Sequence, residues 1–365
     1  MTRIYLIRHA EAEGNLYRIA QGQYDSLVTD RGMRQIAALE KRFEGVRIDA
    51  VYSSDLYRTC VTAGALYIPR RLPLHRMPAL REICVGEWEQ KTWGEIARRW
   101  PEEMVLFNTR LDLWSAEGAE TAEQVRDRML SALREITAAN DGKTVALFSH
   151  GCAIRILLAT IQGYSIAQVG ETPLGTNTAV SLVESDGDGW RVVFRDDASH
   201  LTGDLTRKRG GPRPLDPGLI FTALSDAGQA DRLRAFAGEN GLDPEPLIRD
   251  NASRPVFLGE LDGAVVGALQ LDEPQEAERK RGWITLCHIA AGRRKHGYGV
   301  QLLGQAVAHY RPLGREALCA AVSGDDGDAL LFCGEYGFHP TGEVTPKGLR
   351  VLEKDIAFHP LKSFS

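Results

Sequence analysis

Two histidines and two arginines in the first half of the chain follow apolar runs, where they could bind and transfer a phosphoryl group. Arg8 and His9 come directly after the run at 4–7, and His150 and Arg58 each follow a further apolar run. Such runs are typical of buried parallel strands, and ligand sites in open α/β sheets lie at the carboxyl ends of the strands. We therefore expect these four side chains to meet at one edge of a sheet.

These residue types favour phosphoryl transfer through a phosphohistidine. His9 would attack the phosphorus atom of a monoester, which requires a neutral imidazole. Arg8 and Arg58 disfavour protonation of His9, and they also stabilise the charge on the transferring oxygens. An arginine fork matches phosphate geometry, so lysine would be a poor replacement. His150 would be a second phosphate donor, and Asn15 a neutral hydrogen-bond donor.

Roughly the first 200 residues resemble the histidine phosphatase superfamily, which contains the cofactor-dependent phosphoglycerate mutases and the α-ribazole phosphatases. The segments that carry the resemblance occur in the family's order: LIRHA, QGQYDSLVTDRG, SSDLYRTCVTA, LREICVGEWE and SHGCAIR. One departure is Ala10, where the family usually has glycine. The resemblance implies an α/β fold, with a three-layer α/β/α phosphoglycerate mutase-like domain at the amino end.

The resemblance also implies further site residues. By its place in LREICVGEWE, Glu82 is the candidate for the carboxyl group that protonates the leaving alkoxide and then activates water, whereas Glu87 and Glu89 are interpreted as structural or rim residues. Substrate and phosphate contacts are expected at Asn15, Gln21 and Gly22. Specificity would come from Gln21, the aromatic excursion at 88–100 and Glu120. The other histidines show no spacing typical of a metal site, which predicts turnover without a metal.

A different pattern begins after TGDLTRKRGGPRPLDPG, a run rich in glycine and proline that indicates a linker. FLGELDGAVVGALQL predicts two strands joined at Asp262-Gly263. ITLCHIAAGRRKHGYGVQLLGQAVAHY then resembles the signature of the GNAT N-acetyltransferases, an α+β family that binds acetyl-CoA. Glycines in such a loop let backbone amides at a helix start approach a pyrophosphate. The expected acetyl-CoA contacts are Ile289, Arg294, Lys295, His296, Gly297, Tyr298, Gly299 and Val300.

Acetyl transfer is less clearly indicated than acetyl-CoA binding. Cys333 stands four residues before Gly337, where the family often has a tyrosine that donates a proton. A thiol could protonate the departing coenzyme A thiolate, or Cys333 could serve only in packing. His288, on the expected cofactor strand, is a candidate base. The domain could therefore transfer an acetyl group or only bind acetyl-CoA.

Length and composition predict two globular domains. The chain has 365 residues, 43% of them hydrophobic and 25% charged. The expected boundaries are 1–202 for the first domain, 203–217 for the linker and 218–365 for the second domain. A net charge of −5 argues against nucleic acid as a partner.

The absence of an apolar stretch of membrane-spanning length argues against a membrane location. Only four apolar residues precede Arg8, so we expect no signal peptide. Six cysteines without a C-x-x-C pair indicate reduced thiols, and hence a cytoplasmic protein.

Three functions follow from these observations. The leading one is a phosphomonoesterase that acts on a small phosphorylated metabolite and carries an acetyl-CoA domain. A phosphoglycerate mutase-type isomerase would use the same pocket but would have to exclude water. The third is a phosphatase that a non-catalytic acetyl-CoA-binding module regulates.

Overall fold

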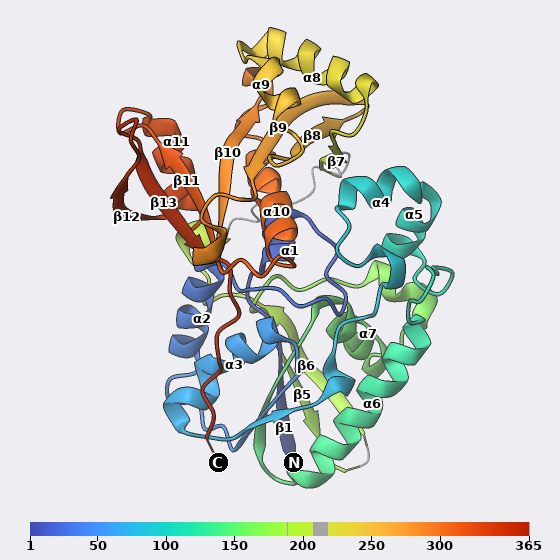
Figure 1. Ribbon diagram of the computed structural model, residues 1–365. Helices are drawn as coiled ribbons and strands as arrows, with labels where there is room; N and C mark the ends of the chain where they lie inside the picture. Colours follow the sequence, from blue (N-terminus) through green and yellow to red (C-terminus); the bar gives the residue numbers. More distant parts are fainter. Residues whose placement is uncertain (188, 207–217, 365) are drawn as a thin grey trace.

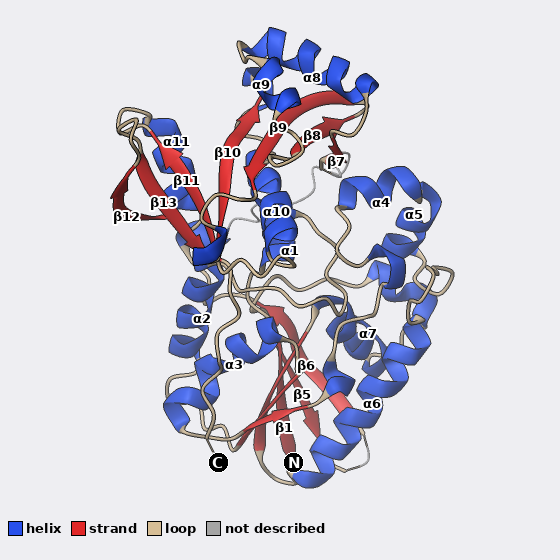
Figure 2. Cartoon of the chain, in the orientation of Figure 1, coloured by secondary structure: helices blue, strands red, loops and turns tan. Residues whose placement is uncertain are grey.

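The structure is a computed structural model that describes residues 1–187, 189–206 and 218–364. Two β-sheets organise it, one built from residues before 198 and the other from residues after 219 (Figures 1 and 2). Most of the expected linker, from 207 to 217, falls outside the described residues. The domain boundaries remain a prediction, and each sheet falls within one of the two expected domains.

The first sheet brings the ends of three parallel strands to one edge. Within the described residues it has six strands in the order β3-β2-β4-β1-β5-β6. Their bounds are β1 Thr2–Arg8, β2 Ala50–Ser53, β3 Leu74–Arg76, β4 Thr144–Ser149, β5 Val180–Ser185 and β6 Trp190–Asp197. β4 pairs in parallel with β1 and β2, so Arg8 lies opposite Ser149, and Ser53 lies opposite Phe148. The residues that follow these strands therefore meet, as expected.

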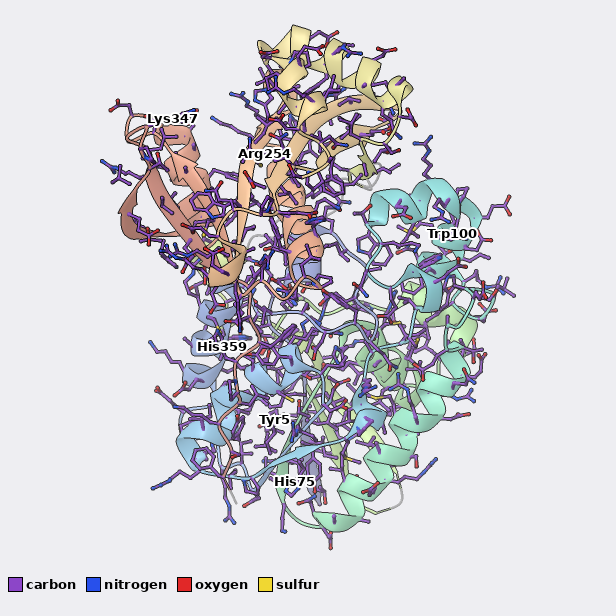
Figure 3. All side chains as sticks on the ribbon, viewed as in Figure 1. Tyr5, His75, Trp100, Arg254, Lys347 and His359 are labelled. Atoms are coloured by element: carbon purple, nitrogen blue, oxygen red, sulfur yellow. The ribbon has the colours of Figure 1, made fainter. Side chains whose placement is uncertain are left out.

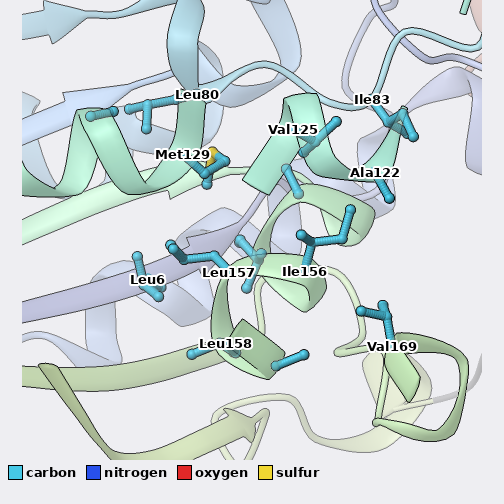
Figure 4. Close-up of a cluster of buried hydrophobic side chains, with 14 of the residues drawn as sticks. Leu6, Leu80, Ile83, Ala122, Val125, Met129, Ile156, Leu157, Leu158 and Val169 are labelled. Carbon is cyan, nitrogen blue, oxygen red and sulfur yellow. The ribbon is translucent and has the colours of Figure 1, made fainter. Parts of the chain in front are cut away.

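Helices cover both faces of this sheet and complete the three layers (Figure 1). The helices are α2 Asp30–Arg42 and α3 Tyr57–Arg70 on one face, with α6 Ala122–Ala139 and α7 Gly151–Ile161 on the other. Figure 4 shows the core beneath α6 and α7, where Leu6 of β1 lies near Met129 and Leu157. The α/β/α architecture is thus confirmed.

Shorter elements lie in the connections of the first domain. They are α1 Glu13–Tyr17, α4 Trp93–Arg99 and α5 Pro101–Thr109, with 3-10 turns at Pro78–Leu80, Gly86–Trp88, Ile166–Glu171 and Gly203–Thr206. The aromatic excursion is anchored in the core: Trp88 is fully buried, with its ring 5.3 Å from that of Trp114 and 5.6 Å from that of Phe107. Trp100, labelled in Figure 3, belongs to the same cluster. Trp88 therefore positions α4 and α5 and does not line a pocket.

The second sheet diverges in its middle. Within the described residues it has seven strands in the order β12-β13-β11-β10-β9-β8-β7. Their bounds are β7 Ile220–Ala223, β8 Val256–Leu261, β9 Ala264–Asp272, β10 Arg281–Ile289, β11 Ala317–Val322, β12 His339–Val344 and β13 Arg350–Asp355. β10 pairs with β11 only as far as Ile284 but with β9 as far as Ile289. The carboxyl half of β10 is therefore left unpaired on the β11 side.

Four helices accompany the second sheet in the described part of the chain. They are α8 Ala227–Asn240, α9 Pro244–Arg249, α10 Gly299–Tyr310 and α11 Gly327–Glu335, with 3-10 turns at Ala277–Arg279 and Ala291–Arg293. The predicted hairpin is confirmed, since Asp262 and Gly263 join β8 to β9 with φ angles of 51° and 82°. None of the helices in the described ranges is long and apolar enough to cross a membrane.

The two halves of the chain are in direct contact through α10 and α1. Leu16 and Tyr17 of α1 belong to the same buried cluster as Leu303 and Val307 of α10. Gly304 permits the close approach, because a Cβ atom there would lie 2.5 Å from the Cβ of Tyr17.

The chain end forms a second contact between the halves. The Tyr67 hydroxyl of α3 donates to the Lys362 carbonyl at 2.8 Å, and Phe364 packs in the core of the first domain. The last residues of the expected second domain thus lie on the first domain.

We expect Gly304→Ala to lower the stability of the protein although alanine favours helix. The added methyl would overlap Tyr17, which costs roughly 1–3 kcal/mol against a helix-propensity gain of about 1 kcal/mol. Thermal unfolding measures the net effect. The matched control is Gly238→Ala in α8, where the new Cβ meets open space. This substitution should leave the unfolding temperature unchanged or raise it. If both substitutions shift the midpoint equally, the close contact of α1 and α10 is incorrect.

Candidate active site

His9 lies at the centre of the site, directly after β1, and its ring is held in one orientation. It is only 3% exposed. Its Nδ1 atom lies 2.7 Å from the carbonyl oxygen of Ala10. A carbonyl can only accept, so Nδ1 carries the proton and Nε2 keeps its lone pair. Burial, then Arg58 and Arg8, hold the pKa of His9 well below its usual value. The imidazole is therefore neutral and can act as a nucleophile.

Alanine at position 10 is compatible with this arrangement. Its backbone does not adopt a positive φ, so the position does not need the freedom of glycine. The Ala10 amide donates to the Thr62 hydroxyl at 2.9 Å, and that hydroxyl donates to the Arg58 carbonyl at 2.6 Å. The departure from the family pattern is thus accommodated without strain.

Arg58 is buried at the start of α3 and is aimed by backbone carbonyls. Its two terminal nitrogens donate to Tyr24 at 2.8 Å and to Gly22 at 2.7 Å. Burial lowers its pKa to about 10, so it stays charged at neutral pH. Arg8 donates to the Gly175 carbonyl at 2.5 Å. The Nε atoms of both arginines are buried and have no hydrogen-bond partner among the described residues.

His150 faces His9, with the two ring centroids 5.3 Å apart. It is fully buried, and burial followed by Arg58 holds its pKa well below the usual value. The Ser54 hydroxyl lies 2.9 Å from Nε2 and accepts from the Leu56 amide at 3.3 Å. If Ser54 donates to Nε2, Nδ1 carries the proton, and Nδ1 has no partner among the described residues. A neutral His150 can therefore still donate to a phosphate.

Glu82 lies beside this group, at the amino end of α7. Its carboxylate oxygens accept from the backbone amides of Cys152 at 3.0 Å and Ala153 at 2.9 Å. A helix amino end favours a negative charge. Glu82 also acts on the pKa of both Arg8 and Arg58. The structure thus places the expected acid and base with the histidines and arginines.

The remaining expected contacts lie close to the histidines and arginines described above. Asn15 accepts at Oδ1 from the Ala12 amide at 3.0 Å, so its Nδ2 group is the donor it can offer to an anion. Gln21 accepts from the Ser26 hydroxyl at 2.6 Å. Gly22 supplies its carbonyl to Arg58 and has a φ of 45°. Gln21 and Gly22 therefore shape the loop at 21–26.

Two carboxylates that could have contacted a substrate instead form hydrogen bonds and an ion pair within the protein. Glu89 accepts from the amides of Gln23 at 2.7 Å and Tyr24 at 2.5 Å, which holds the loop at 21–26. Glu120, expected to set specificity, pairs with Arg128 at 2.8 Å and accepts from the Cys84 amide at 2.9 Å. Glu120 and Arg128 therefore stabilise the backbone segment that carries Glu82.

Asn177 is a site residue that the sequence analysis missed. Its Nδ2 group donates to the His9 carbonyl at 3.0 Å and to Asn15 Oδ1 at 3.3 Å. It precedes β5, which is antiparallel to β1. The amino end of an antiparallel strand lies at the same sheet edge as the carboxyl ends of β1 and β4. Polar residues just before β5 could therefore have been identified from the sequence as candidates for the site.

The second domain places its expected cofactor contacts in two groups. Ile289, Tyr298 and Val300 are buried in the core, so only their backbone groups could reach a ligand. The loop before α10 carries exposed Arg294, Lys295 and His296, and Gly297 has a φ of 80°. An exposed cationic loop that ends at the amino terminus of α10 suits a pyrophosphate. Gly299 starts that helix next to the ring of Phe332.

The two residues considered for acetyl transfer do not converge. Cys333 on α11 acts on the pKa of Cys287, so it lies on the Cys287 side of β10. His288 points to the opposite face, with its ring 6.0 Å from that of Phe236 in α8. Burial raises the pKa of Cys333 to about 11, so its thiol is protonated at neutral pH. Cys333 can donate a proton, whereas His288 lies away from it.

No group of three or more histidine, cysteine, aspartate and glutamate side chains is arranged to hold a metal ion within the ranges that the structure covers. All six cysteines lie in these ranges and are free.

Comparisons with known proteins match the two halves separately. The model of the histidine phosphatase superfamily (branch 1) matches residues 4–198, and that of the acetyltransferase (GNAT) family matches residues 224–338. The "Probable phosphoglycerate mutase GpmB" of Proteus mirabilis is 31% identical, over 55% of this chain and 96% of its own. The "Metal-independent phosphoserine phosphatase" of Arabidopsis thaliana is also 31% identical, over 58% of this chain and 87% of its own.

A solved structure supports the same assignment. Bacillus stearothermophilus YhfR superimposes with a TM-score of 0.54 at 32% identity, over 55% of this chain and 99% of its own. The match covers nearly the whole of that smaller protein. The chain therefore belongs to the histidine phosphatase superfamily and carries a GNAT-family domain in its second half.

Proposed function

We propose that the first domain is a metal-independent phosphomonoesterase that acts on a small phosphorylated metabolite through a phosphohistidine at His9. The strongest support is a set of buried nitrogens without partners among the described residues: Nε of Arg8, Nε of Arg58 and Nδ1 of His150. Buried donors without partners are costly. Three of them around a neutral imidazole suit the oxygens of a phosphate.

The proposed reaction has two steps. In the first, the Nε2 lone pair of His9 attacks phosphorus, an N–P bond forms and the P–O ester bond breaks. The leaving alkoxide takes a proton from the Glu82 carboxyl group. In the second, water attacks the phosphorus, Glu82 takes the proton of that water and the N–P bond breaks. Inorganic phosphate leaves and neutral His9 is restored.

A phosphoglycerate mutase reaction is the alternative for the same pocket. A mutase would keep the phosphohistidine away from water and return the phosphoryl group to the substrate. The name of the Proteus mirabilis relative supports this alternative. We favour hydrolysis because the short first domain resembles the phosphatase branch and because the Arabidopsis thaliana relative is named as a phosphatase.

We propose that the second domain binds acetyl-CoA at the amino end of α10, with Arg294, Lys295 and His296 facing its phosphates. Bound acetyl-CoA would supply an acetyl group for transfer to an acceptor, and Cys333 would be the proton donor. A purely regulatory role has its own support, because α10 runs from this loop to α1 of the first domain.

His9→Ala should abolish phosphate release, because the nucleophile is lost. We expect a fall of roughly 10⁴-fold or more across a panel of phosphomonoesters, assayed with a chelator present. The control is His339→Ala, on an exposed strand of the second domain. Full activity in His9→Ala would rule out the phosphohistidine. With 3-phosphoglycerate, a mutase would instead yield 2-phosphoglycerate without free phosphate.

Glu82→Gln should slow the hydrolysis of alkyl phosphates far more than that of activated aryl phosphates. A poor leaving group needs the proton, so we expect a loss of about 10²–10⁴-fold for alkyl esters. Steady-state rates for a series of leaving groups measure this. Glu87→Gln is the control, since Glu87 is also a carboxylate but accepts from the Glu117 amide at 3.4 Å. Equal losses for all esters would contradict the acid role.

Gly297→Ala should weaken acetyl-CoA binding measured by calorimetry, by roughly tenfold. Alanine at a φ of 80° is strained by about 1–2 kcal/mol, so the loop would turn its amides away from the ligand. Gly292→Ala in the same exposed loop is the control, because its φ is not positive and a Cβ there meets open space. Equal binding by both variants and the wild type would place the ligand elsewhere.

A further inference from the structure

Arg311, the residue that follows the last residue of α10, reaches from the GNAT domain to the first domain. Its Nη2 group donates to Glu13 Oε1 at 2.9 Å, and the two side chains are only 15% and 7% exposed. Its Nη1 group lies 3.5 Å from the Tyr24 hydroxyl. Its Nε group donates to the Ile356 carbonyl at 3.1 Å. One side chain thus joins α1, the loop at 21–26 and the chain end.

Glu13 connects Arg311 to Asn15 in the phosphate pocket. Its second carboxylate oxygen accepts from the Leu27 amide at 3.0 Å, and its own amide donates to the Leu27 carbonyl at 2.9 Å. Glu13 is the first residue of α1, a helix of only five residues that also carries Asn15. A helix this short is not stable alone. Its position therefore depends on contacts such as the one with Arg311.

Tyr24 connects Arg311 to Arg58. The Tyr24 carbonyl accepts from Nη1 of Arg58 at 2.8 Å, so a shift of Tyr24 would move the guanidinium. A second path runs through the chain end. The Arg311 guanidinium lies over the Phe358 ring, 5.2 Å from its centroid, and that ring packs edge-on against Tyr57, the residue before Arg58. Figure 3 shows His359, the next residue, where the chain end runs onto the first domain.

We propose that Arg311 of the GNAT domain is a positioning residue for the phosphatase reaction, because it holds α1 and the loop at 21–26 where Asn15 and Arg58 face the phosphate. The proposal rests on the proposed phosphatase function and adds a residue of the other domain to it. Removal of Arg311 leaves the buried Glu13 carboxylate without its cation. The two elements that carry the phosphate donors then lose a shared anchor.

The test uses the full chain with Arg311→Ala and two readouts, the KM for a phosphomonoester and inhibition by orthovanadate. Orthovanadate imitates the transferring phosphoryl group. Misplaced Asn15 and Arg58 should raise both KM and the vanadate inhibition constant by about tenfold. Partial unfolding alone would lower kcat per mole of protein and leave both constants unchanged. Arg311→Lys should restore the two constants only in part, because lysine keeps the positive charge but lacks the several N–H donors of the guanidinium group.

Two further variants sharpen the result. Arg254→Ala removes an ion pair of 2.7 Å to buried Asp272 inside the GNAT domain, and it should leave both constants unchanged. Combining Glu13→Gln with Arg311→Ala should raise KM and the vanadate inhibition constant no more than either single variant does, because the two side chains act together. Unchanged constants in folded Arg311→Ala, or an equal loss in Arg254→Ala, would overturn the proposal.

The proposed phosphatase function is tested separately by the wild type. If wild-type protein binds orthovanadate without releasing phosphate, hydrolysis is wrong, and the vanadate dissociation constants of wild type and Arg311→Ala, measured by calorimetry, then decide the role of Arg311. If it neither binds vanadate nor releases phosphate, both proposals fail.

Discussion

The site depends on positive charge that is buried and, within the described part of the chain, not hydrogen-bonded to a carboxylate. Arg58 is 1% exposed and donates only to backbone carbonyls, and its Nε has no partner among the described residues. Such burial is expensive unless an anion completes it. Burial of His9, and then the charge of Arg58 and Arg8, hold the pKa of His9 low and keep it neutral. In the proposed mechanism the same buried cations bind the anion and help to keep the nucleophile neutral, so the surrounding structure must hold them in place.

That requirement explains why so much of the chain surrounds one edge of the sheet. The carbonyls that orient Arg58 come from a loop, and a loop keeps a position only when other groups fix it. Glu89 fixes Tyr24 through its amide, and Asn177 fixes the backbone of His9 and the amide of Asn15. These residues touch no reacting atom in the proposed mechanism. They fix the positions of the residues that do contact the reacting atoms.

Sequence patterns predicted the parts of the site that regular elements deliver. His9 and His150 follow buried strands, and Arg58 lies in the first turn of a helix, so periodicity and strand ends placed them together. Glu82 is in an irregular segment and was found only through the resemblance. Asn177 was missed because it precedes an antiparallel strand, whereas the sequence analysis considered only residues that follow strands. The long-range contacts of Arg311 leave no local pattern.

The contact between α10 and α1 makes the two halves energetically dependent on each other. Relatives that match over 87–96% of their own length match only 55–58% of this chain, a share close to that of the phosphatase match at residues 4–198. Here α1 buries Leu16 and Tyr17 against α10, and Gly304 brings the helices together. In the proposed function, α10 connects the acetyl-CoA loop at its amino end to Arg311 at its carboxyl end, so a shift of the helix on acetyl-CoA binding would move Arg311. By linkage, any effect of acetyl-CoA on phosphate affinity must be matched by an equal effect of phosphate on acetyl-CoA affinity.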